Sequence, residues 1–425
     1  MRQMQNWAGN YTYGAAELQV PGSVEEVQEL VARSRKIKVL GTRHSFNGIA
    51  DTEGTLLSLE KLNRVIALDR ARRKVTVEGG IRYGELCRFL HEHGFALHNL
   101  ASLPHITVAG ACATATHGSG DRSANLAAAV DSMEVVKADG ETVVFSRDRK
   151  DGDFAGAVVH LGGLGVVTKI TLDVIPAFPM CQHVYENLPL AQLEHHLDAI
   201  FSSAYSVSLF TDWKHPVFHQ VWIKKKLPEQ DTSAQPPEPD FFGAKPAAVR
   251  KHPVPGYPAD SCNEQLGIPG PWHERMPHFR MEFTPSAGDE LQSEYFVPRE
   301  HAYAALCAID SIRETISPHL HVCEVRTIAE DDFWMSPCYK RHSVGIHFTW
   351  KADEEAVGQL LPVIERKLEP FRARPHWGKL FAMPPARLQS LYGKLPDFRQ
   401  LLLRLDPEGK FRNGFLNQTI VENRS

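Results

Sequence analysis

The sequence predicts a protein of mixed helices and strands that is divided into two lobes. With 425 residues, the chain is longer than one hydrophobic core usually supports, so two lobes are the expected arrangement. Up to about residue 175, short strand patterns follow one another closely with few helices between them, which indicates meandering sheets. Beyond that point the pattern changes to strands that alternate with amphipathic helices.

Composition and charge exclude several classes of protein. Hydrophobic residues make up 43% of the chain and charged residues 23%, which is ordinary for a globular protein. The net charge of -4 gives no basic excess to hold phosphate backbones, so no nucleic-acid partner is expected. The N-terminus lacks the apolar run of a signal peptide and no later stretch could cross a bilayer, so we expect a cytoplasmic protein without a membrane partner. The seven cysteines are scattered without CxxC pairs, so neither a disulfide framework nor a metal site is expected.

The first helix and strand lead directly to the most informative loop of the chain. Ser23 and Glu26 have capping-box spacing, and the apolar residues that follow form one helical stripe, so a helix begins at residue 24. A strand at 38–40 then runs into the loop Gly41–Asn47, in which His44 is followed by a small polar residue. A glycine-opened loop of this kind can lie against a flat cofactor. The alternative is a surface loop with a solvated histidine, which an isolated motif of this type would favour.

The rest of the first lobe follows from local patterns. A helix over Arg82–His93 ends at Gly94, which supplies a left-handed stop. The residues at 138–140 form a hairpin turn, and the glycine-rich turn at 161–165 leads into a buried strand. Strands are predicted at 55–59, 65–68, 74–78, 132–137, 142–145 and 166–172.

Two further segments have unusual composition. Small side chains dominate residues 101–120, so their Gly, Thr and Ser amides can form a nest for a pyrophosphate that bulky side chains would hold away. The alternative for this segment is a tightly packed turn. In residues 374–379, proline and glycine on either side of a tryptophan fix the backbone and deliver Lys379 to a defined place. The alternative here is a loop that its tryptophan anchors.

The second lobe is predicted to present polar side chains on one face of a sheet. Because strand side chains alternate, Glu324 and Arg326 share one face of their strand, as do His347 and Thr349 of the next. These pairs predict one wall of a polar pocket, and the alternative is the solvent face of an ordinary antiparallel sheet. The predicted elements are an extended proline-rich loop at 227–260, a strand at 278–284, a helix at 299–316, strands at 321–328 and 343–350, and a helix at 354–370.

Together these features resemble the vanillyl-alcohol oxidase superfamily of flavoproteins, and within it the alditol (xylitol) oxidases. The histidine loop and the His-Trp-x-Lys motif recur across sugar oxidases, whereas residues 205–213 and 269–275 favour the alditol branch over aldonolactone oxidases. The resemblance implies an α+β, two-lobed fold of the vanillyl-alcohol oxidase type. Residues 1–175 would form an FAD-binding domain of the p-cresol methylhydroxylase type, residues 176–375 a substrate domain on an antiparallel sheet flanked by helices, and residues 376–425 a segment that returns to the FAD domain. The matching segments are 6–10, 41–47, 101–105, 116–120, 205–213, 269–275 and 374–379.

The resemblance also implies a cofactor, FAD, attached covalently through His44. Neutral imidazole is a good nucleophile near pH 7, which suits this attachment. Two residues depart from the family pattern: Ala115 replaces a glycine in a tight turn, and Cys112 stands in the pyrophosphate segment, where we interpret it as a small core residue rather than a second covalent link. The residues implied to contact FAD are Val39, Leu40, Gly41, Thr42, Arg43, Ser45, Ser102, Thr107, Gly110, Thr114, Ala115, Thr116, His117 and Val166.

By the same resemblance, a polyol would be recognised through hydroxyl contacts. A polyol offers only hydroxyls, so a group of donors and acceptors suits it. We expect His347 to be the catalytic base, with Arg326 and Lys379 lowering the pKa of the alcohol and stabilising negative charge. The residues implied to contact substrate are Ser102, Glu324, Arg326, His347, Thr349 and Lys379.

The expected activity is therefore oxidation of the terminal C1 primary alcohol of alditols such as xylitol or sorbitol to the aldose, with O2 reduced to H2O2, by a monomeric enzyme. A near alternative is a sugar-1,4-lactone oxidase or dehydrogenase of the same superfamily; the small Ala101, expected beside the reactive edge of the flavin, does not decide the electron acceptor. A binding protein on a degenerate scaffold is disfavoured because His44, Glu324 and Lys379 are retained together with Arg326 and His347. A nicotinamide-dependent dehydrogenase is disfavoured because no strand-GxGxxG-helix unit is present.

Overall fold

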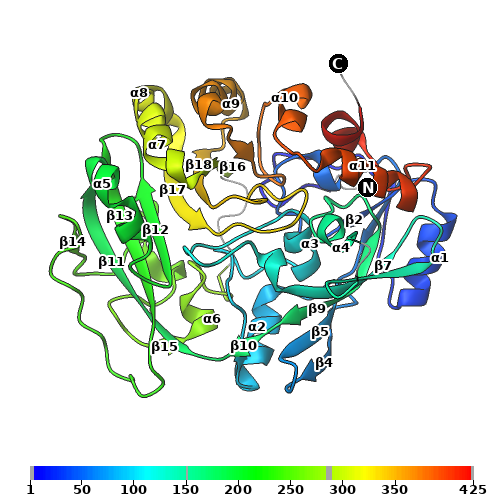
Figure 1. The fold of residues 1–425 in the computed structure, drawn as a ribbon, viewed down its shortest axis with the longest axis horizontal. Helices are drawn as coiled ribbons and strands as arrows, with labels where there is room; N and C mark the ends of the chain where they lie inside the picture. Colours follow the sequence, from blue (N-terminus) through cyan, green and yellow to red (C-terminus); the bar gives the residue numbers. More distant parts are fainter. Residues whose placement is uncertain (1–3, 150–151, 284–289, 423–425) are drawn as a thin grey trace.

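The computed structural model describes residues 4–149, 152–283 and 290–422. Two lobes lie beside each other, and each is built on its own sheet system (Figure 1). No helix of the described ranges is both long enough and apolar enough to span a bilayer.

The first lobe contains two main sheets. A parallel sheet has the order β1 (Glu17–Gln19), β3 (Thr55–Ser58), β2 (Ile37–Leu40). An antiparallel sheet has the order β4 (Val65–Asp69), β5 (Lys74–Glu78), β9 (Val166–Asp173), β7 (Val130–Val136), β8 (Thr142–Ser146), and the short strands β6 (Phe95–Ala96) and β10 (Ile175–Pro176) pair beside it. The helices are α1 (Val24–Arg33), α2 (Tyr83–Glu92), α3 (Val108–Ala113) and α4 (Phe154–Ala157), with 3-10 turns at Gly48–Ala50 and Leu126–Ala129.

Helix ends in this lobe follow the predicted local chemistry. The hydroxyl of Ser23 accepts the backbone N–H of Glu26 at 3.2 Å and caps α1. The Glu26 carboxylate reaches the N–H of Gly22 at 2.7 Å rather than that of Ser23, so the reciprocal half of the capping box is displaced by one residue. Helix α2 is followed by Gly94 with φ +82°, as the left-handed stop requires.

The second lobe is built on one large antiparallel sheet. Its strand order is β14 (Lys245–Pro246), β11 (Pro179–Pro189), β13 (Val217–Lys226), β12 (Ser206–Thr211), β17 (Leu320–Ile328), β18 (Ser343–Lys351), β16 (Glu290–Pro298), β19 (Arg374–Pro375), and β15 (Gly270–Pro271) pairs with β11. The helices are α5 (Leu193–Phe201), α6 (Trp272–Arg275), α7 (Ala302–Asp310), α8 (Arg313–Ile316) and α9 (Glu354–Leu368). Short 3-10 turns lie at Leu190–Gln192, Ala259–Ser261, Arg299–His301, Ser317–His319 and Glu369–Phe371.

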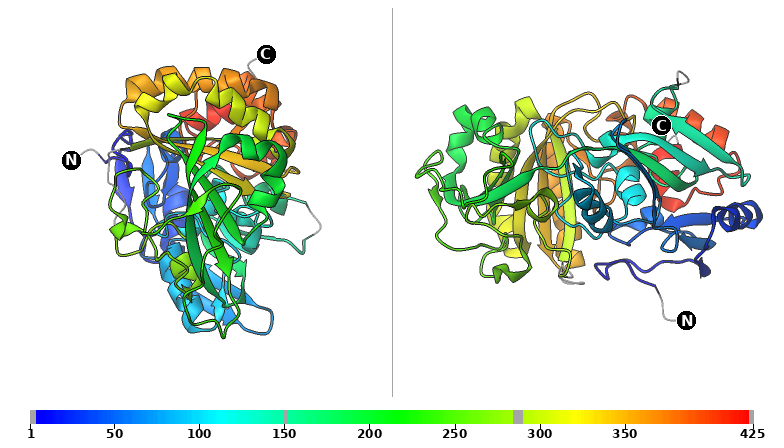
Figure 2. Two further views of the ribbon diagram at one scale, coloured as in Figure 1. Left: turned by 90° about the vertical axis from the view of Figure 1, so that its left-hand side faces the viewer. Right: turned by 90° about the horizontal axis from the view of Figure 1, so that it is seen from below.

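Helices cover one face of this sheet and thereby decide which side chains face the first lobe. Helices α5, α7, α8 and α9 form a layer along the sheet (Figures 1 and 2). Val325, Ile346 and Phe348 are fully buried in the same apolar cluster as residues of α5, α7 and α9. Because side chains alternate along a strand, Glu324 and His347 lie on the opposite face.

The C-terminal helices pack on the first lobe. Leu388, Phe398 and Leu402 belong to the apolar cluster that contains Val77 and Leu172 of the antiparallel sheet. This part of the chain comprises α10 (Pro385–Ser390), α11 (Leu395–Leu405), α12 (Gly414–Leu416) and a π-helical turn at Asn417–Val421 (Figure 1).

Two predicted elements of the second lobe are wrong. Residues 278–283 form a loop that makes a single bridge, between Phe279 and Cys262, although apolar and polar residues alternate there; Thr284 lies outside the described residues. The strand of this region is β16, which was not predicted. The helix expected at 299–316 is broken between α7 and α8, where Ile312 has φ -119° and the Ser311 hydroxyl competes for the carbonyl of Ala308 at 2.7 Å.

Candidate active site

A cavity of about 480 Å³ is lined by side chains from both lobes. It adjoins a second cavity of about 510 Å³ in the first lobe, because residues 39–44, Thr107 and Gly110 line both. The space therefore runs from the parallel sheet of the first lobe to the polar face of the large sheet. Of the predicted FAD contacts, Ala115 and Val166 line neither cavity, whereas the others line at least one.

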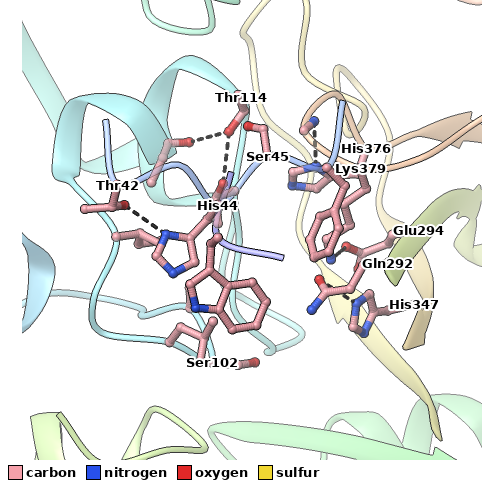
Figure 3. A pocket seen from close by; sticks show the side chains of 18 of the residues that line it. Thr42, His44, Ser45, Ser102, Thr114, Gln292, Glu294, His347, His376 and Lys379 are labelled. Carbon is pink, nitrogen blue, oxygen red and sulfur yellow. Dashed lines mark hydrogen bonds and ion pairs between the residues drawn. The ribbon is translucent and has the colours of Figure 1, made fainter. Parts of the chain in front are cut away.

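His44 lies in the first-lobe part of this space (Figure 3). Its Nδ1 lies 3.0 Å from the hydroxyl of Thr42, and the ring of Trp7 stacks on it at 5.4 Å. Its Nε2 is buried and has no hydrogen-bond partner among the described residues. Burial, more than any neighbouring charge, lowers the pKa of His44 to about 4, so the ring is neutral at pH 7.

The small residues around Thr107 bring backbone close to the same space. A Cβ atom on Gly41 would lie 2.9 Å from Thr107 Oγ1, and one on Gly110 would lie 2.7 Å from it. Neither position accepts a side chain without movement of its neighbour. The two residues that depart from the family pattern are both buried. Ala115 adopts φ +53° in the tight turn, and the thiol of Cys112 lies in the core 3.8 Å from the hydroxyl of Tyr83.

A row of ionisable side chains crosses the polar face of the large sheet. Glu324 of β17 pairs directly with His347 of β18, and His347 pairs directly with Glu294 of β16. All three line the cavity, as do Arg326 and Thr349. The structure therefore brings the predicted polar pairs of two strands to one wall, and Ser102 of the first lobe lies 3.4 Å from the guanidinium of Arg326.

Glu294 binds the cationic groups of this wall. Its carboxylate is fully buried and accepts hydrogen bonds from Lys379 Nζ at 2.7 Å and from the guanidinium of Arg326 at 3.0 Å. His117 Nε2 lies 3.1 Å away. Burial acts to raise the pKa of Glu294, but Lys379, His117 and Arg326 outweigh it and hold this pKa well below its usual value. Glu294 is therefore an anion, and Lys379 points toward it (Figure 3).

The loop after β19 delivers Lys379 to this carboxylate. The N–H of His376 donates to the carbonyl of Glu294, and the N–H of Leu380 donates to the carbonyl of Gln292, both at 2.9 Å. These bonds tie the loop to the edge of β16 on either side of Lys379. Burial lowers the pKa of Lys379, and Glu294 opposes that effect.

Glu324 is held from behind by a histidine and a lysine. His278 Nε2 lies 2.8 Å from the Glu324 carboxylate, and Lys224 Nζ lies 3.1 Å from His278 Nδ1. Lys224 also donates to the carbonyls of Met276 at 2.5 Å and Pro277 at 2.8 Å. Since the ionised Glu324 carboxylate only accepts, His278 donates from Nε2, and the neutral ring accepts from Lys224 at Nδ1. Burial favours raising the pKa of Glu324, but Arg326 and His278 keep it below its usual value.

Sequence reasoning missed several residues of this site. Gln292 and Glu294 lie on β16, where polar residues alternate with Leu291, Tyr295 and Val297; the same alternation identified the other two strands and could have identified this one. His278 and Lys224 have no local signal in the sequence, because His278 reaches Glu324, and Lys224 reaches His278, from other parts of the fold. Within the described ranges, no group of three or more His, Cys, Asp and Glu side chains could hold a metal ion.

Comparisons with known proteins agree with this architecture. Residues 16–146 match the family model of the FAD binding domain, and residues 289–419 match that of D-arabinono-1,4-lactone oxidase. The chain is 50% identical to an alditol oxidase of Streptomyces sp. over 418 residues, which is 98% of each chain. It is 28% identical to the L-gulonolactone oxidase of Mus musculus over 442 residues and to the L-gulono-1,4-lactone dehydrogenase of Mycobacterium tuberculosis over 431, again 98% of each chain.

A solved structure extends the comparison to the fold. Cholesterol oxidase from B. sterolicum superposes with a TM-score of 0.78 at 14% identity and covers 99% of this chain and 96% of its own. At that identity the likeness shows the fold alone, which is the two-lobed fold that the sequence predicts. The full-length match at 50% identity shows the family: the chain belongs to the alditol oxidase family of the vanillyl-alcohol oxidase superfamily.

Proposed function

We propose that the protein is an FAD-dependent alditol oxidase that converts the terminal C1 primary alcohol of polyols such as xylitol or sorbitol to the aldose and reduces O2 to H2O2. One observation carries this proposal. A single cavity joins a neutral histidine with an unpartnered ring nitrogen to a wall of hydrogen-bonding and charged side chains. Full-length similarity to the Streptomyces alditol oxidase supports the choice of substrate class.

The residues of the first lobe fit a flat, tightly held FAD. Small side chains surround Thr107, and the buried Nε2 of His44 has no hydrogen-bond partner among the described residues, as expected of an imidazole that bonds to a cofactor. We propose covalent attachment through His44 to FAD, with residues 1–175 as the FAD domain, 176–375 as the substrate domain and 376–425 completing the FAD side. Bound FAD would take two electrons from the alcohol and pass them to O2. The further residues that would hold it are Val39, Leu40, Gly41, Thr42, Arg43, Ser45, Ser102, Gly110, Thr114, Thr116 and His117.

Side chains of the second lobe would form hydrogen bonds with the hydroxyls of the substrate. Arg326 and Lys379 are donors, and the Glu324 oxygen that does not bind His278 is an acceptor. Each hydroxyl can donate one hydrogen bond and accept others, so a polyol would satisfy both kinds of group. Ser102 and Thr349 would complete the contacts.

His347 would be the base. Lys379 donates to the anionic Glu294, and an arginine stays protonated, so neither is available to accept a proton. Burial, with a further contribution from Lys379, holds the pKa of His347 well below its usual value, so the ring is neutral at pH 7 and can accept one.

A substrate panel tests the proposal. Purified protein should be yellow, and xylitol or sorbitol should yield one H2O2 per O2 consumed. A sugar-1,4-lactone is the second candidate, because the D-arabinono-1,4-lactone oxidase model covers β16 through Lys379. Peroxide from lactones and none from polyols would reject the main proposal, and electrons passed to an artificial acceptor but not to O2 would make the protein a dehydrogenase.

A further inference from the structure

Gln292 connects a carboxylate to the proposed base. Its amide nitrogen donates to the Glu290 carboxylate at 2.6 Å. Its carbonyl oxygen lies 3.2 Å from His347 Nε2 (Figure 3). The connection follows from the sheet register. Gln292 pairs with Thr349 and Glu294 pairs with His347, so Gln292 and His347 are diagonal neighbours on one face of β16 and β18.

The direction of both hydrogen bonds can be deduced. An ionised carboxylate only accepts, so the side of the Gln292 amide that contacts Glu290 is its NH2 group. The carbonyl therefore points to His347, and a carbonyl only accepts, so Nε2 of His347 carries a hydrogen. In a neutral imidazole the other nitrogen then has the lone pair. The ring of His347 makes no other hydrogen bond in the described chain, and it lines the cavity.

We propose that Gln292, oriented by Glu290, is a positioning residue that holds His347 in the Nε2–H tautomer and makes Nδ1 the atom that accepts the substrate proton. The inference rests on the proposed function, in which His347 is the base. The alcohol O–H bond breaks and an N–H bond forms at Nδ1. The hydrogen of the alcohol C–H bond would leave with both bonding electrons as hydride to bound FAD, the oxidant named above, and the carbon would become a carbonyl.

Several titratable and charged groups face His347 and influence its pKa. They are Glu290 and Glu294 from β16, Glu324 and Arg326 from β17, and His376 and Lys379 from the loop after β19. Glu294 and Glu324 favour the imidazolium, whereas Lys379 and Arg326 oppose it. A carboxylate placed directly on Nε2–H would add to the first group and raise the pKa of His347.

Nuclear magnetic resonance of the holoenzyme with 15N-labelled histidine tests the tautomer directly. The His347 signals are identified by their loss in His347→Gln. The expected result is a protonated Nε2 and an unprotonated Nδ1 from pH 6 to 9. A protonated Nδ1 in this range, or an imidazolium, overturns the inference whatever the activity of the protein.

Two variants test the consequence for turnover. Gln292→Met should mix the two tautomers and lower kcat for xylitol about tenfold or more. The exchange Glu290→Gln with Gln292→Glu keeps the total charge and places the carboxylate on His347, so the acid limb of the kcat profile should move to higher pH. Gln182→Met makes the same chemical change on β11, across the sheet, and is the matched control.

The outcomes separate the two proposals. If no polyol reduces the flavin of the unmodified enzyme, the proposed function fails, and the resonance experiment still decides the tautomer. If polyols are oxidised but the exchange leaves the acid limb in place, or Gln292→Met behaves like Gln182→Met, then Gln292 does not position the base and the inference is rejected.

Discussion

Lys379 Nζ lies 2.7 Å from the carboxylate of Glu294, and that carboxylate is fully buried. Glu294 also accepts a hydrogen bond from Arg326, so this carboxylate pairs with two cations that face the cavity, and Glu324 is a second anion beside Arg326. A buried charge is costly unless it is paired, and removing one partner of such a pair leaves the other uncompensated. Glu294 thus allows two positive groups to remain at the site where negative charge would develop on the substrate oxygen.

Glu294→Gln should remove this balance. Lys379 would then lose its ion-pair partner, and Arg326 would keep only Glu324, 3.6 Å from its Nε, so the pKa of Lys379 should fall further. We expect kcat/KM for xylitol to drop at least about 100-fold and the free energy of unfolding to drop by about 3 kcal/mol. Stopped-flow flavin reduction and urea unfolding measure the two effects. Glu355→Gln on the exposed side of α9 is the control, and a Glu294→Gln enzyme that matched it in both measurements would contradict this role.

His44→Ala tests the cofactor attachment. The variant should bind FAD loosely or not at all, because the bond through the imidazole is absent and the stacking with Trp7 is lost. After acid precipitation, yellow colour should stay with the unmodified protein and should move to the supernatant, or be absent, in the variant. His195→Ala replaces an exposed histidine of α5 and should retain the colour. Colour that stays with precipitated His44→Ala would show that another residue holds the flavin.

Lys379→Ala should separate substrate activation from cofactor binding. The side chain lines the polar wall and contacts Glu294, whereas the residues that would hold FAD lie mainly in the first lobe. We expect flavin content to remain unchanged and turnover of polyols to fall by about 100-fold or more. Visible absorbance and peroxide release measure the two quantities. Unchanged turnover would remove Lys379 from the site, and loss of flavin would move it to the cofactor.

The polar wall could be predicted from the sequence only in part. Glu324, Arg326, His347 and Thr349 lie on strands whose two-residue period is visible in the letters, so their shared face followed without knowledge of the fold. Apolar and polar residues also alternate around Glu294. The same alternation occurs at residues 278–283, and the strand was therefore predicted in that segment instead of in β16. The local pattern of a sequence predicts which side chains share one face of a strand, but it does not predict which other strand pairs with that strand.

Contacts between distant segments could not be predicted from such patterns. His278 lies in a loop, 46 positions before the carboxylate that it binds, and only the packing of that loop against β17 brings the two together. The same is true of Lys224. Its Nζ donates to the carbonyls of residues 276 and 277, and neither the composition nor the spacing of the sequence predicts these contacts. The cofactor loop was easier to predict from the sequence, because Gly41 and His44 lie close together in one short segment.

His278 also gives a prediction for stability as a function of pH. Burial, with a further contribution from Lys224, lowers its pKa from 6.5 to about 4 in the folded protein. Between these values the unfolded chain binds a proton that the folded chain does not, so this group makes the protein less stable as the pH falls from about 6.5 to about 4. One such proton corresponds to about 1.4 kcal/mol per pH unit.

His278→Gln should remove the contribution of this residue to the pH dependence of stability, while it preserves the contacts with Glu324 and Lys224. The amide nitrogen of glutamine can donate to Glu324, and its oxygen can accept from Lys224, so the geometry of the site is retained without a titrating ring. We expect the free energy of unfolding of the variant to fall less steeply than that of the unmodified protein between pH 6.5 and 4, by about one proton. Urea unfolding at half-unit pH intervals measures it, with His195→Gln as the exposed control. Equal slopes in His278→Gln and the unmodified protein would mean that folding does not lower the pKa of His278, and the ring would then be protonated on both nitrogens in this pH range.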